Sequence, residues 1–323
     1  MGWAFPDSWG DWTDKVKTEL TIVVETISRF EPVRLLTKRG ELRDATARFA
    51  GGNVEIVEAP IEDFWMRDIA PTFACGENGV VAIDWNFDNW GRTIKGPTSS
   101  LSGFFEKEIR IPTIRAPFTA EGGAFITDGE GTLITTRSCL LNPNRNPVRM
   151  DYDRQSEIER ALRAFGIERV IWLEGDPCED ISSGHVDGYA MFAAAGGVLV
   201  ETIGDDSAEY PMWQSRDLET LDGASDAKRR IKITTIFAPR KKYWKFRNAS
   251  WAPCYLNAYI ANGAIIAANF GDRERDEAAN AMFKKMFPGR KVVMLRIDHI
   301  ANGGGGIHCM TQPVPPTDEL NSV

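Results

Sequence analysis

A cysteine follows a run of four glycines close to the end of the sequence. The run is Gly303–Gly306, and Cys309 lies three residues beyond it. Consecutive glycines cannot fill a core and are kept where backbone must turn or approach another group closely, so we expect a loop here. Backbone N–H groups around a thiol favour a reactive thiolate. Cys309 is the candidate nucleophile, although a lone cysteine is more often a small buried apolar residue.

Two further stretches could supply a proton carrier and negative charge. His185 and Asp187 stand in the sequence Gly-His-Val-Asp-Gly, and Asp68 follows Trp65, Met66 and Arg67. Residues two apart share a face of an extended segment, so His185 and Asp187 can point into one pocket. By the same rule Trp65 and Arg67 share a face, opposite Asp68. The alternatives are a structural histidine and a buried ion pair between Arg67 and Asp68.

Glu121 and Asn257 are the other polar candidates. Glu121 stands before two glycines, and Asn257 stands within a predicted hairpin. A thiol, a histidine and two carboxylates suit a cationic substrate with an electrophilic carbon. A guanidinium fits this description, because two carboxylates can hold its N–H donors while the thiolate meets its central carbon. Its positive charge would also favour the thiolate of Cys309.

One unit of strand, glycine turn, strand, helix and strand recurs along the chain and must position these residues. The predicted hairpins pair residues 72–75 with 80–83, 124–126 with 132–135, 189–192 with 198–200, and 256–260 with 264–267. Helices are predicted over 101–109, 155–165, near 217 and over 274–287, followed by strands over 111–115, 170–173, 231–237 and 292–297. The turn glycines, at 79, 131, 197 and 263, recur about every 50 to 66 residues, a spacing typical of repeats.

The two ends of the sequence predict the fifth unit. Residues 306–312 would pair with residues 2–5, and a helix over 11–30 would lead into a strand over 33–36. Five units around one axis form a single α/β domain over residues 1–323, not two domains in tandem. Each polar candidate precedes or enters a different unit, so we expect them to meet at one end of the ring. An α/β sandwich with one mixed sheet is the alternative fold.

Composition excludes several classes of partner and cofactor. The net charge of −8 argues against nucleic acid and anionic membranes and mildly favours a cationic substrate. The five cysteines are scattered without a CxxC spacing, and the three histidines lack an HExxH pattern, so no disulfide framework, metal site or cofactor is expected. The sequence shows no signal peptide and no apolar stretch near the ~20 residues of a membrane span. We therefore expect a cytoplasmic protein.

The motifs together resemble the guanidine-modifying pentein superfamily, in the branch of agmatine deiminases and bacterial-type peptidyl-arginine deiminases. The resemblance covers nearly the whole chain. Its carriers are Trp65–Asp68 with Pro71–Phe73, Glu121–Gly123, Leu141–Pro147, Gly184–Asp187, Tyr255–Asn257 and Gly304–Gln312.

This resemblance implies a five-bladed, pseudosymmetric α/β propeller that hydrolyses a small guanidine, such as agmatine to N-carbamoylputrescine, and releases ammonia without a cofactor. It makes Cys309 the nucleophile that carries a covalent amidino-thioether and His185 the general acid and then base. It assigns the remaining roles as follows: Asp68 and Asp187 clamp the guanidinium, Asn257 orients the substrate, Trp65 forms a pocket wall, and Glu121 is a helper or structural carboxylate.

One position departs from the family pattern. Agmatine deiminases typically have a carboxylate four residues before the histidine, where this chain has Ile181. The expected substrate is therefore agmatine-like or another small guanidine. The alternatives are a peptidyl-arginine or arginine deiminase, an amidinotransferase, and a non-catalytic pentein scaffold. A thiol protease is disfavoured because paired aspartates have no evident task in amide hydrolysis. A homo-oligomer is compatible with the sequence.

Overall fold

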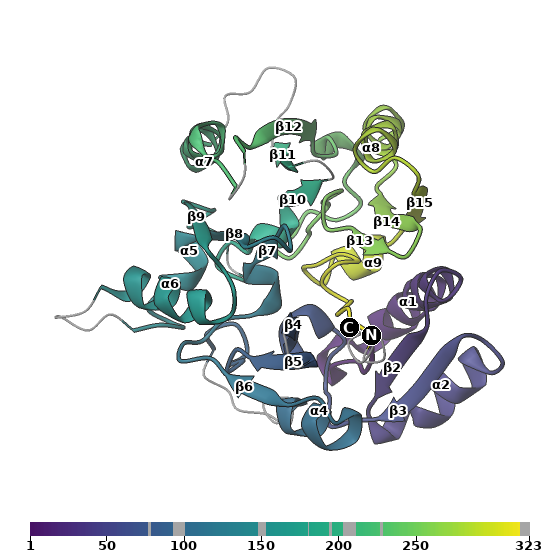
Figure 1. The fold of residues 1–323 in the computed structure, drawn as a ribbon. Coiled ribbons are helices and arrows are strands. Elements are labelled where there is room, and N and C mark those ends of the chain that lie inside the picture. Colours follow the sequence, from purple (N-terminus) through teal and green to yellow (C-terminus); the bar gives the residue numbers. More distant parts are fainter. Residues whose placement is uncertain are drawn as a thin grey trace.

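The computed structural model describes residues 1–76, 79–92, 101–147, 153–179, 181–193, 196–202, 211–226 and 229–316. Its described strands form five separate three-stranded sheets, which follow one another around a common centre (Figure 1). The segment after α9 (Asp298–Ala301) runs through this centre. The chain is thus a mixed α/β protein whose sheets all border one central region.

The strands are short and are listed here sheet by sheet. They are β1 (Gly2–Trp3), β2 (Val33–Thr37) and β3 (Val54–Glu58); β4 (Thr72–Gly76), β5 (Gly79–Asp84) and β6 (Thr113–Arg115); β7 (Ile126–Thr127), β8 (Thr132–Thr136) and β9 (Arg169–Leu173); β10 (Ala190–Ala193), β11 (Gly197–Thr202) and β12 (Lys232–Phe237); and β13 (Tyr259–Ala261), β14 (Ala264–Asn269) and β15 (Lys291–Arg296).

Four sheets share one topology, a hairpin followed by a parallel strand. β4 pairs antiparallel with β5, with Thr72 opposite Ile83, and β5 pairs parallel with β6. The same pattern recurs in the next three sheets. The four predicted hairpins and the strand after each are confirmed. A parallel neighbour requires a crossover connection, and the helices between these strands supply it.

The first sheet differs, and the prediction of a hairpin between residues 2–5 and 306–312 is wrong. β1 pairs parallel with β2, and β2 pairs parallel with β3. Residues 306–312 form turns and irregular backbone. Their backbone groups bond to loops instead: Arg67 N donates to the Cys309 carbonyl at 3.0 Å, and His308 N donates to the Asn257 carbonyl at 3.2 Å. The segment therefore crosses the centre and extends no sheet.

Helices lie around the outside of the sheets (Figure 1). They are α1 (Thr13–Ser28), α2 (Leu42–Phe49), α4 (Leu101–Ile109), α6 (Arg154–Ala164), α7 (Met212–Gly223) and α8 (Arg273–Met286), with the short turns η1 (Asp7–Trp12), η2 (Arg39–Glu41), α5 (Arg137–Leu140) and η7 (Lys241–Tyr243). The helix predicted over 11–30 is α1 preceded by η1. None of the described helices has the length and hydropathy needed to cross a membrane.

Charge placement and burial explain why α8 forms where it does. Glu274 and Asp276 stand in its first turn and Lys284 and Lys285 in its last, which complements the helix dipole. β14 beside it is a run of small and branched apolar residues, Ala264–Ala268, that is fully buried. A strand covered on both faces is expected to read as a continuous apolar run. The fifth sheet is therefore part of the largest apolar cluster of the described residues.

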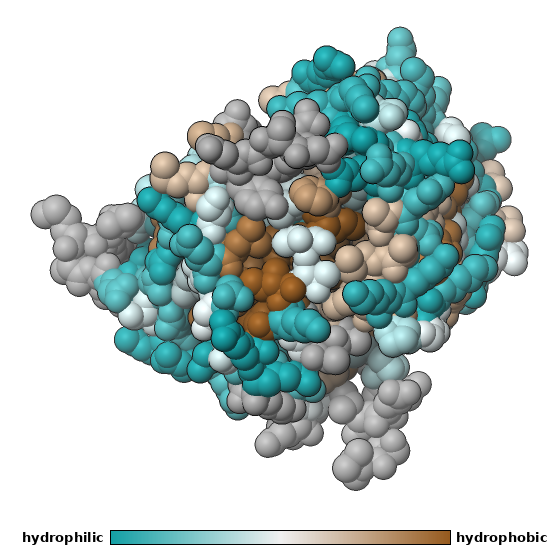
Figure 2. Space-filling model, turned by 90° about the horizontal axis from the view of Figure 1, so that it is seen from above, coloured by the Kyte–Doolittle hydropathy of each residue, from teal (hydrophilic) through white to brown (hydrophobic). Residues whose placement is uncertain are grey.

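One face of the molecule carries exposed apolar side chains. Seen from above, the surface has an apolar hollow surrounded by hydrophilic residues (Figure 2). α7 and β12 lie on this side in Figure 1, and they carry the exposed Met212 and Phe237.

A buried glutamate connects the fourth sheet to the loop that leads into the fifth. Glu201, near the end of β11, accepts hydrogen bonds from the backbone N–H groups of Tyr255 at 2.7 Å and Leu256 at 2.9 Å, and from the Cys254 thiol at 3.2 Å. Burial raises the pKa of Glu201 to about 7, although these bonds oppose the shift. Glu201 therefore fixes the backbone directly before Asn257.

We expect Glu201 to make the protein less stable as the pH rises from about 4.5 to 7. Over this interval the folded state keeps a proton on Glu201 that the unfolded state has lost, so the free energy of unfolding falls by about 3 kcal/mol in total. Glu201→Gln keeps an oxygen for the two N–H donors and should lack this slope. Urea unfolding between pH 5 and 8 measures it, with the exposed Glu219→Gln as control. Parallel curves for wild type and Glu201→Gln would contradict the expectation.

Candidate active site

Asp68 stands in a single helical turn, α3 (Met66–Ile69), directly before β4. The predicted extended conformation of residues 65–68 is therefore wrong. The turn forms because the N–H groups of Asp68 and Ile69 both donate to the Trp65 carbonyl at 3.1 Å. Asp68 is 6% exposed and accepts bonds from Gly123 N and Trp90 Nε1, both at 2.9 Å. Its two oxygens are thus held toward the second and third sheets.

His185 precedes a second short turn, η5 (Val186–Gly188), and Asp187 lies within it, directly before β10. The sequence predicts both residues on one face of an extended segment. The structure differs, because the backbone here forms a 3-10 turn. Asp187 Oδ2 lies 2.7 Å from His308 Nδ1 and 3.5 Å from the Cys309 sulfur. His185 Nδ1 lies 3.8 Å from Asp68 Oδ2. The predicted histidine and both predicted aspartates therefore lie in one cluster.

Cys309 lies at the centre of this cluster, and Asn257 holds it. Asn257 Nδ2 donates to the Cys309 sulfur at 3.0 Å, and Asn257 Oδ1 accepts from Cys309 N at 3.1 Å. Asn257 was predicted within a hairpin, but it precedes β13, which begins at Tyr259. The loop position leaves both ends of its amide free to bond the cysteine. The thiol is thus fixed by its own backbone and by a side-chain amide.

Glu121 precedes a third short turn, η4 (Gly122–Ala124), and lies deeper than the aspartates. The strand predicted to start at residue 124 begins at Ile126 instead. Glu121 is fully buried, and its Oε2 lies 3.3 Å from His185 Nε2. Arg145 Nε donates to both oxygens of Glu121, at 2.8 and 3.0 Å. His185 is therefore placed between two carboxylates, with Asp68 near one ring nitrogen and Glu121 near the other.

The charges of this cluster shift each other's pKa values. Burial alone would lower the pKa of His185, but Asp68, Cys139 and Glu121 raise it well above its ordinary value, so the imidazole carries a proton at neutral pH. Burial would raise the pKa of Glu121, but His185 and Arg145 lower it. The imidazole is thus poised to donate a proton.

The two aspartates are shifted in opposite directions. Burial raises the pKa of Asp68, although the charge of His185 opposes the shift. Burial would also raise the pKa of Asp187, but the hydrogen bond from His308 lowers it. Burial, followed by the charges of Asp187 and Asp68, raises the pKa of the Cys309 thiol well above its ordinary value. The free thiol is therefore protonated at neutral pH, and a cation placed among these groups would reverse the largest electrostatic part of the shift.

The glycine run allows the loop to lie against the other predicted site residues. A Cβ on Gly305 would lie 2.7 Å from the Trp65 ring and 3.1 Å from the Cys309 sulfur. Gly304 has a φ of +100°, and a Cβ there would lie 2.7 Å from the end of the Ile181 side chain. The backbone thus passes first against Ile181 and then between the Trp65 ring and the Cys309 sulfur, with no room for a Cβ at either position.

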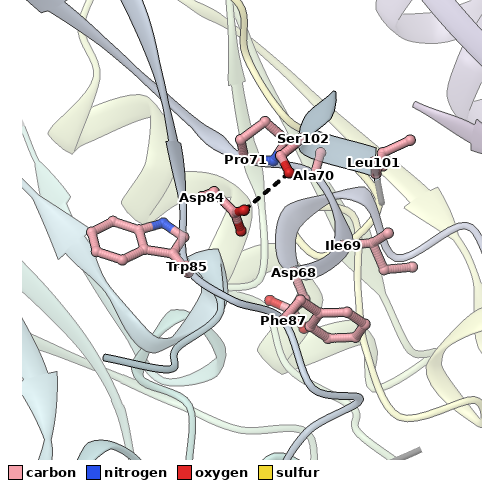
Figure 3. Close-up of a pocket in the computed structure, with 9 residues that line it drawn as sticks. All are labelled: Asp68, Ile69, Ala70, Pro71, Asp84, Trp85, Phe87, Leu101 and Ser102. Carbon is pink, nitrogen blue, oxygen red and sulfur yellow. Dashed lines mark hydrogen bonds between the residues drawn. The ribbon is translucent and has the colours of Figure 1, made fainter. Parts of the chain in front are cut away.

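A small cavity lies on the side of Asp68 that faces β5 and α4 (Figure 3). Its volume is about 10 Å³, close to the minimum for one water molecule. Asp84 and Ser102, which hydrogen-bond at 3.0 Å, line it together with Trp85 and Phe87. The cavity is too small for an organic substrate.

Three buried side chains could in principle hold a metal ion. The ligand atoms of Glu121, Cys139 and His185 all lie within 4.8 Å of one another. Glu121 already accepts two hydrogen bonds from the cationic Arg145, however, and His185 is protonated for the reasons above. A second cation is electrostatically disfavoured there, and metal binding would require His185 to lose its proton.

Three residues of the cluster had no predicted role. His308 bonds Asp187, Trp90 bonds Asp68, and Arg145 bonds Glu121. His308 could have been found from its place beside Cys309, and Arg145 stands in one of the motifs quoted above. Trp90 carries no such signal, because it reaches Asp68 from a left-handed backbone position with a φ of 58°.

Comparison with known proteins gives one consistent result. A profile described as Porphyromonas-type peptidyl-arginine deiminase matches residues 1–315. An agmatine deiminase from Pseudomonas aeruginosa is 35% identical over 96% of this chain and 90% of its own, and a putative agmatine deiminase from Streptomyces coelicolor is 36% identical over 91% and 88%. The structure of an agmatine deiminase from Enterococcus faecalis, 27% identical, aligns with a TM-score of 0.86 over 97% of this chain and 91% of its own.

We expect Gly123→Ala to disrupt the cluster. A Cβ on Gly123 would lie 2.5 Å from His185 Nδ1 and 2.8 Å from Asp68 Oδ1, so both the imidazole and the carboxylate must move away from residue 123. The pKa of His185, followed by imidazole NMR, should move toward its ordinary value, and overpacking should cost about 1–3 kcal/mol of stability. The control is Gly103→Ala in α4, where a Cβ meets nothing within 4 Å. An unchanged His185 titration in folded Gly123→Ala would contradict the expectation.

Proposed function

The chain belongs to the Porphyromonas-type peptidyl-arginine deiminase family, and we propose that it hydrolyses the guanidinium group of a small cationic substrate to a ureido group and ammonia. It is then a hydrolase of C–N bonds in linear amidines, as its agmatine deiminase relatives are by name. The observation that carries the proposal is the position of the Cys309 sulfur, 3.0 Å from Asn257 Nδ2 and 3.5 Å from Asp187 Oδ2, in a cluster that also holds Asp68 and His185.

The charge of the cluster selects the substrate. Asp68 and Asp187 place negative charge beside Cys309, which disfavours both a thiolate and an anionic substrate. A guanidinium would meet both carboxylates with paired N–H donors, in the geometry that Arg uses with carboxylates in proteins. Burial is the largest cause of the raised pKa of the Cys309 thiol and the charges of Asp187 and Asp68 are the next, so a bound guanidinium offsets the effect of the carboxylates and favours the thiolate.

The first chemical step forms a carbon–sulfur bond. As the guanidinium binds, the Cys309 thiol releases its proton to water, and the thiolate attacks the central carbon. Asn257, which donates to the sulfur, orients it. His185 then gives its proton to the departing nitrogen as the carbon–nitrogen bond breaks, and ammonia leaves. An amidino-thioether remains on Cys309, and His185 is neutral.

The second step uses the same imidazole as a base. His185 takes a proton from a water molecule, and the hydroxide attacks the amidino carbon. The carbon–sulfur bond breaks, the thiolate of Cys309 leaves, and the protonated ureido product passes its extra proton to solvent. Glu121 and Asp68, on the two sides of the ring, stabilise the imidazolium that reforms.

We extend the proposal to the architecture and the compartment. The five three-stranded sheets, four of which repeat the same unit, are five blades of a pseudosymmetric propeller that forms a single deiminase domain over residues 1–323. The succession of sheets in Figure 1 supports it. All five cysteines are unpaired, which supports a reducing, cytoplasmic location.

Ile181 bears on the choice of substrate. It lies over Gly304, next to the loop that carries Cys309. The neighbouring Glu179 is not free to meet a substrate cation, because its carboxylate accepts bonds from Ile181 N, from Ser182 N and Oγ, and from Gly184 N. Asp180 lies outside the described residues. A substrate tail that passes Ile181 therefore meets an apolar side chain, which supports a guanidine with a neutral or apolar tail over agmatine.

Replacement of the nucleophile should abolish turnover. Cys309→Ala should lower kcat by roughly 10⁴-fold or more, because a thiolate nucleophile has no substitute in the cluster. A cationic haloacetamidine should alkylate Cys309 faster than neutral iodoacetamide does, because its charge offsets Asp68 and Asp187. Ammonia release and mass spectrometry of product and protein measure both effects, with the exposed Cys178→Ala as control. Turnover by Cys309→Ala, or a product formed by transfer to an amine, would exclude the proposed hydrolysis.

The identity of residue 181 should set the preference between substrate tails. Ile181→Glu should raise kcat/KM for agmatine by about ten- to a hundredfold relative to an alkylguanidine, because an ammonium then gains a charge-assisted bond. The matched control is Ile22→Glu on the exposed face of α1. Wild-type kcat/KM for agmatine above ~10⁴ M⁻¹s⁻¹ with no gain in Ile181→Glu would identify agmatine as the substrate and contradict this role of Ile181.

A further inference from the structure

Arg145 lies behind the cluster and touches none of the groups that would meet a substrate. It belongs to the segment Leu141–Pro147, which follows α5. Its side chain is 0% exposed, and its guanidinium bonds in three directions: Nε to Glu121, Nη1 to Ser183 Oγ at 3.0 Å, and Nη2 to the Ser182 carbonyl at 2.8 Å. One cation thus links Glu121 to the two residues that stand just before Gly184 and His185.

We propose that Arg145 is a positioning residue for His185. Arg145 keeps Glu121 ionised and fixes the loop from which the imidazole of His185 projects. The catalytic readouts of this inference rest on the proposed deiminase function, and the NMR readout does not.

The electrostatic part follows from burial. Glu121 is 0% exposed, and an ionised carboxylate at such a site requires charged or hydrogen-bonding partners. Its partners in the structure are Arg145 and His185. His185 and then Arg145 lower the pKa of Glu121 against the effect of burial, so loss of Arg145 should raise this pKa and weaken the attraction between Glu121 and the imidazolium.

The conformational part follows from the backbone before His185. Ser183 and Gly184 are both left-handed, with φ of 63° and 88°. A serine rarely adopts this conformation unless its surroundings hold it there. Arg145 bonds this loop from one side, and Glu179 accepts from Ser182 N and Gly184 N, at 2.8 and 2.9 Å, from the other. The loop therefore lies between two fixed charged side chains.

The segment of Arg145 is itself rigid. Asn146 accepts from Thr119 N at 3.0 Å and donates to the carbonyls of Thr119 at 2.8 Å and Leu140 at 3.0 Å. Arg145 N and Asn146 N both donate to the Asn142 carbonyl. Arg145 is thus anchored on both flanks, so its guanidinium can impose a position on the loop.

Lysine could replace only part of this arrangement. A lysine ammonium would keep a positive charge near Glu121, but it lacks the planar fork that reaches three acceptors in fixed directions. The two parts of the proposal can therefore be separated, because Arg145→Met removes charge and fork, whereas Arg145→Lys removes mainly the fork.

Several titratable groups other than Glu121 face His185. They are Asp68, Cys139, Asp187 and His308. Because the two aspartates remain in every variant, the imidazole should keep its proton near neutral pH. The loss of Arg145 should appear instead as a higher pKa of Glu121, seen in the acid limb of the pH profile of kcat and in the His185 resonance.

The experiment compares wild type, Arg145→Met, Arg145→Lys and the control Arg163→Met, whose side chain is 63% exposed on α6. For Arg145→Met we expect kcat to fall about 100-fold with KM changed much less, and the acid limb to move up by about one pH unit. For Arg145→Lys we expect a smaller loss of kcat and a smaller movement of the limb. Imidazole NMR of the free protein, which has three histidines, follows the same titration at His185.

The outcomes separate this inference from the proposed function. If wild type releases no ammonia from any guanidine, the proposed function fails, and the His185 titration alone decides the role of Arg145. A folded Arg145→Met protein with unchanged acid limb and unchanged His185 titration overturns the inference. Should Arg145→Met fail to fold, a folded Arg145→Lys protein with wild-type kcat overturns it as well.

Discussion

Asp68, Glu121 and Asp187 are at most 6% exposed, and each lies within 4 Å of an imidazole or a thiol. Removing three carboxylates from water is costly unless each has partners of its own. Arg145 supplies them for Glu121 and His308 for Asp187. The imidazolium of His185 lies between Asp68 and Glu121. The local conformations around the centre are those that bring these partners together.

Three of those conformations are short turns that occupy equivalent positions in different sheets. α3, η4 and η5 are single turns that each stand directly before the first strand of a sheet, namely β4, β7 and β10. Each turn presents a buried acid toward the centre, and neighbouring turns contact each other. Because the sheets repeat around the centre, equivalent positions in different repeats converge there. Residues far apart in sequence thus become neighbours through repetition of one structural unit.

The sequence allowed the prediction of these sheets but not of the turns. Alternating apolar residues around Gly79, Gly131, Gly197 and Gly263 predict the four hairpins, because local periodicity and turn chemistry determine them. The turns at residues 65–69 and 185–188 were predicted as extended, since nothing in their composition competes visibly with a strand. They place buried carboxylates within reach of partners from distant parts of the chain: Gly123 N and Trp90 Nε1 for Asp68, and His308 Nδ1 for Asp187. Such long-range requirements leave no local pattern.

The sequence likewise did not predict which residues the segment after α9 contacts, or which side chains of the site bond to each other. Gly303–Gly306 indicated a close approach of backbone, but not that Trp65, Asn257 and Ile181 are the groups approached. The pairing of 306–312 with the N-terminal strand was wrong because its residues bond to loops. Arg145 could be quoted as part of a motif, yet its role is visible only where its guanidinium meets Glu121.

The segment that carries Cys309 is held by Asn257 and also by residues from early in the chain. Arg67 Nε donates to the His308 carbonyl, and Gln312 Nε2 donates to the Pro71 carbonyl, across 241 residues of sequence in both cases. Contacts of such separation form only after the intervening chain has been ordered, because closing the loop costs entropy before the contact repays it. During synthesis the sheets can assemble as they emerge, whereas Cys309 takes its place last. A chain that lacks this last segment therefore carries the three carboxylates without the thiol, and the cluster is complete only when the final segment has folded.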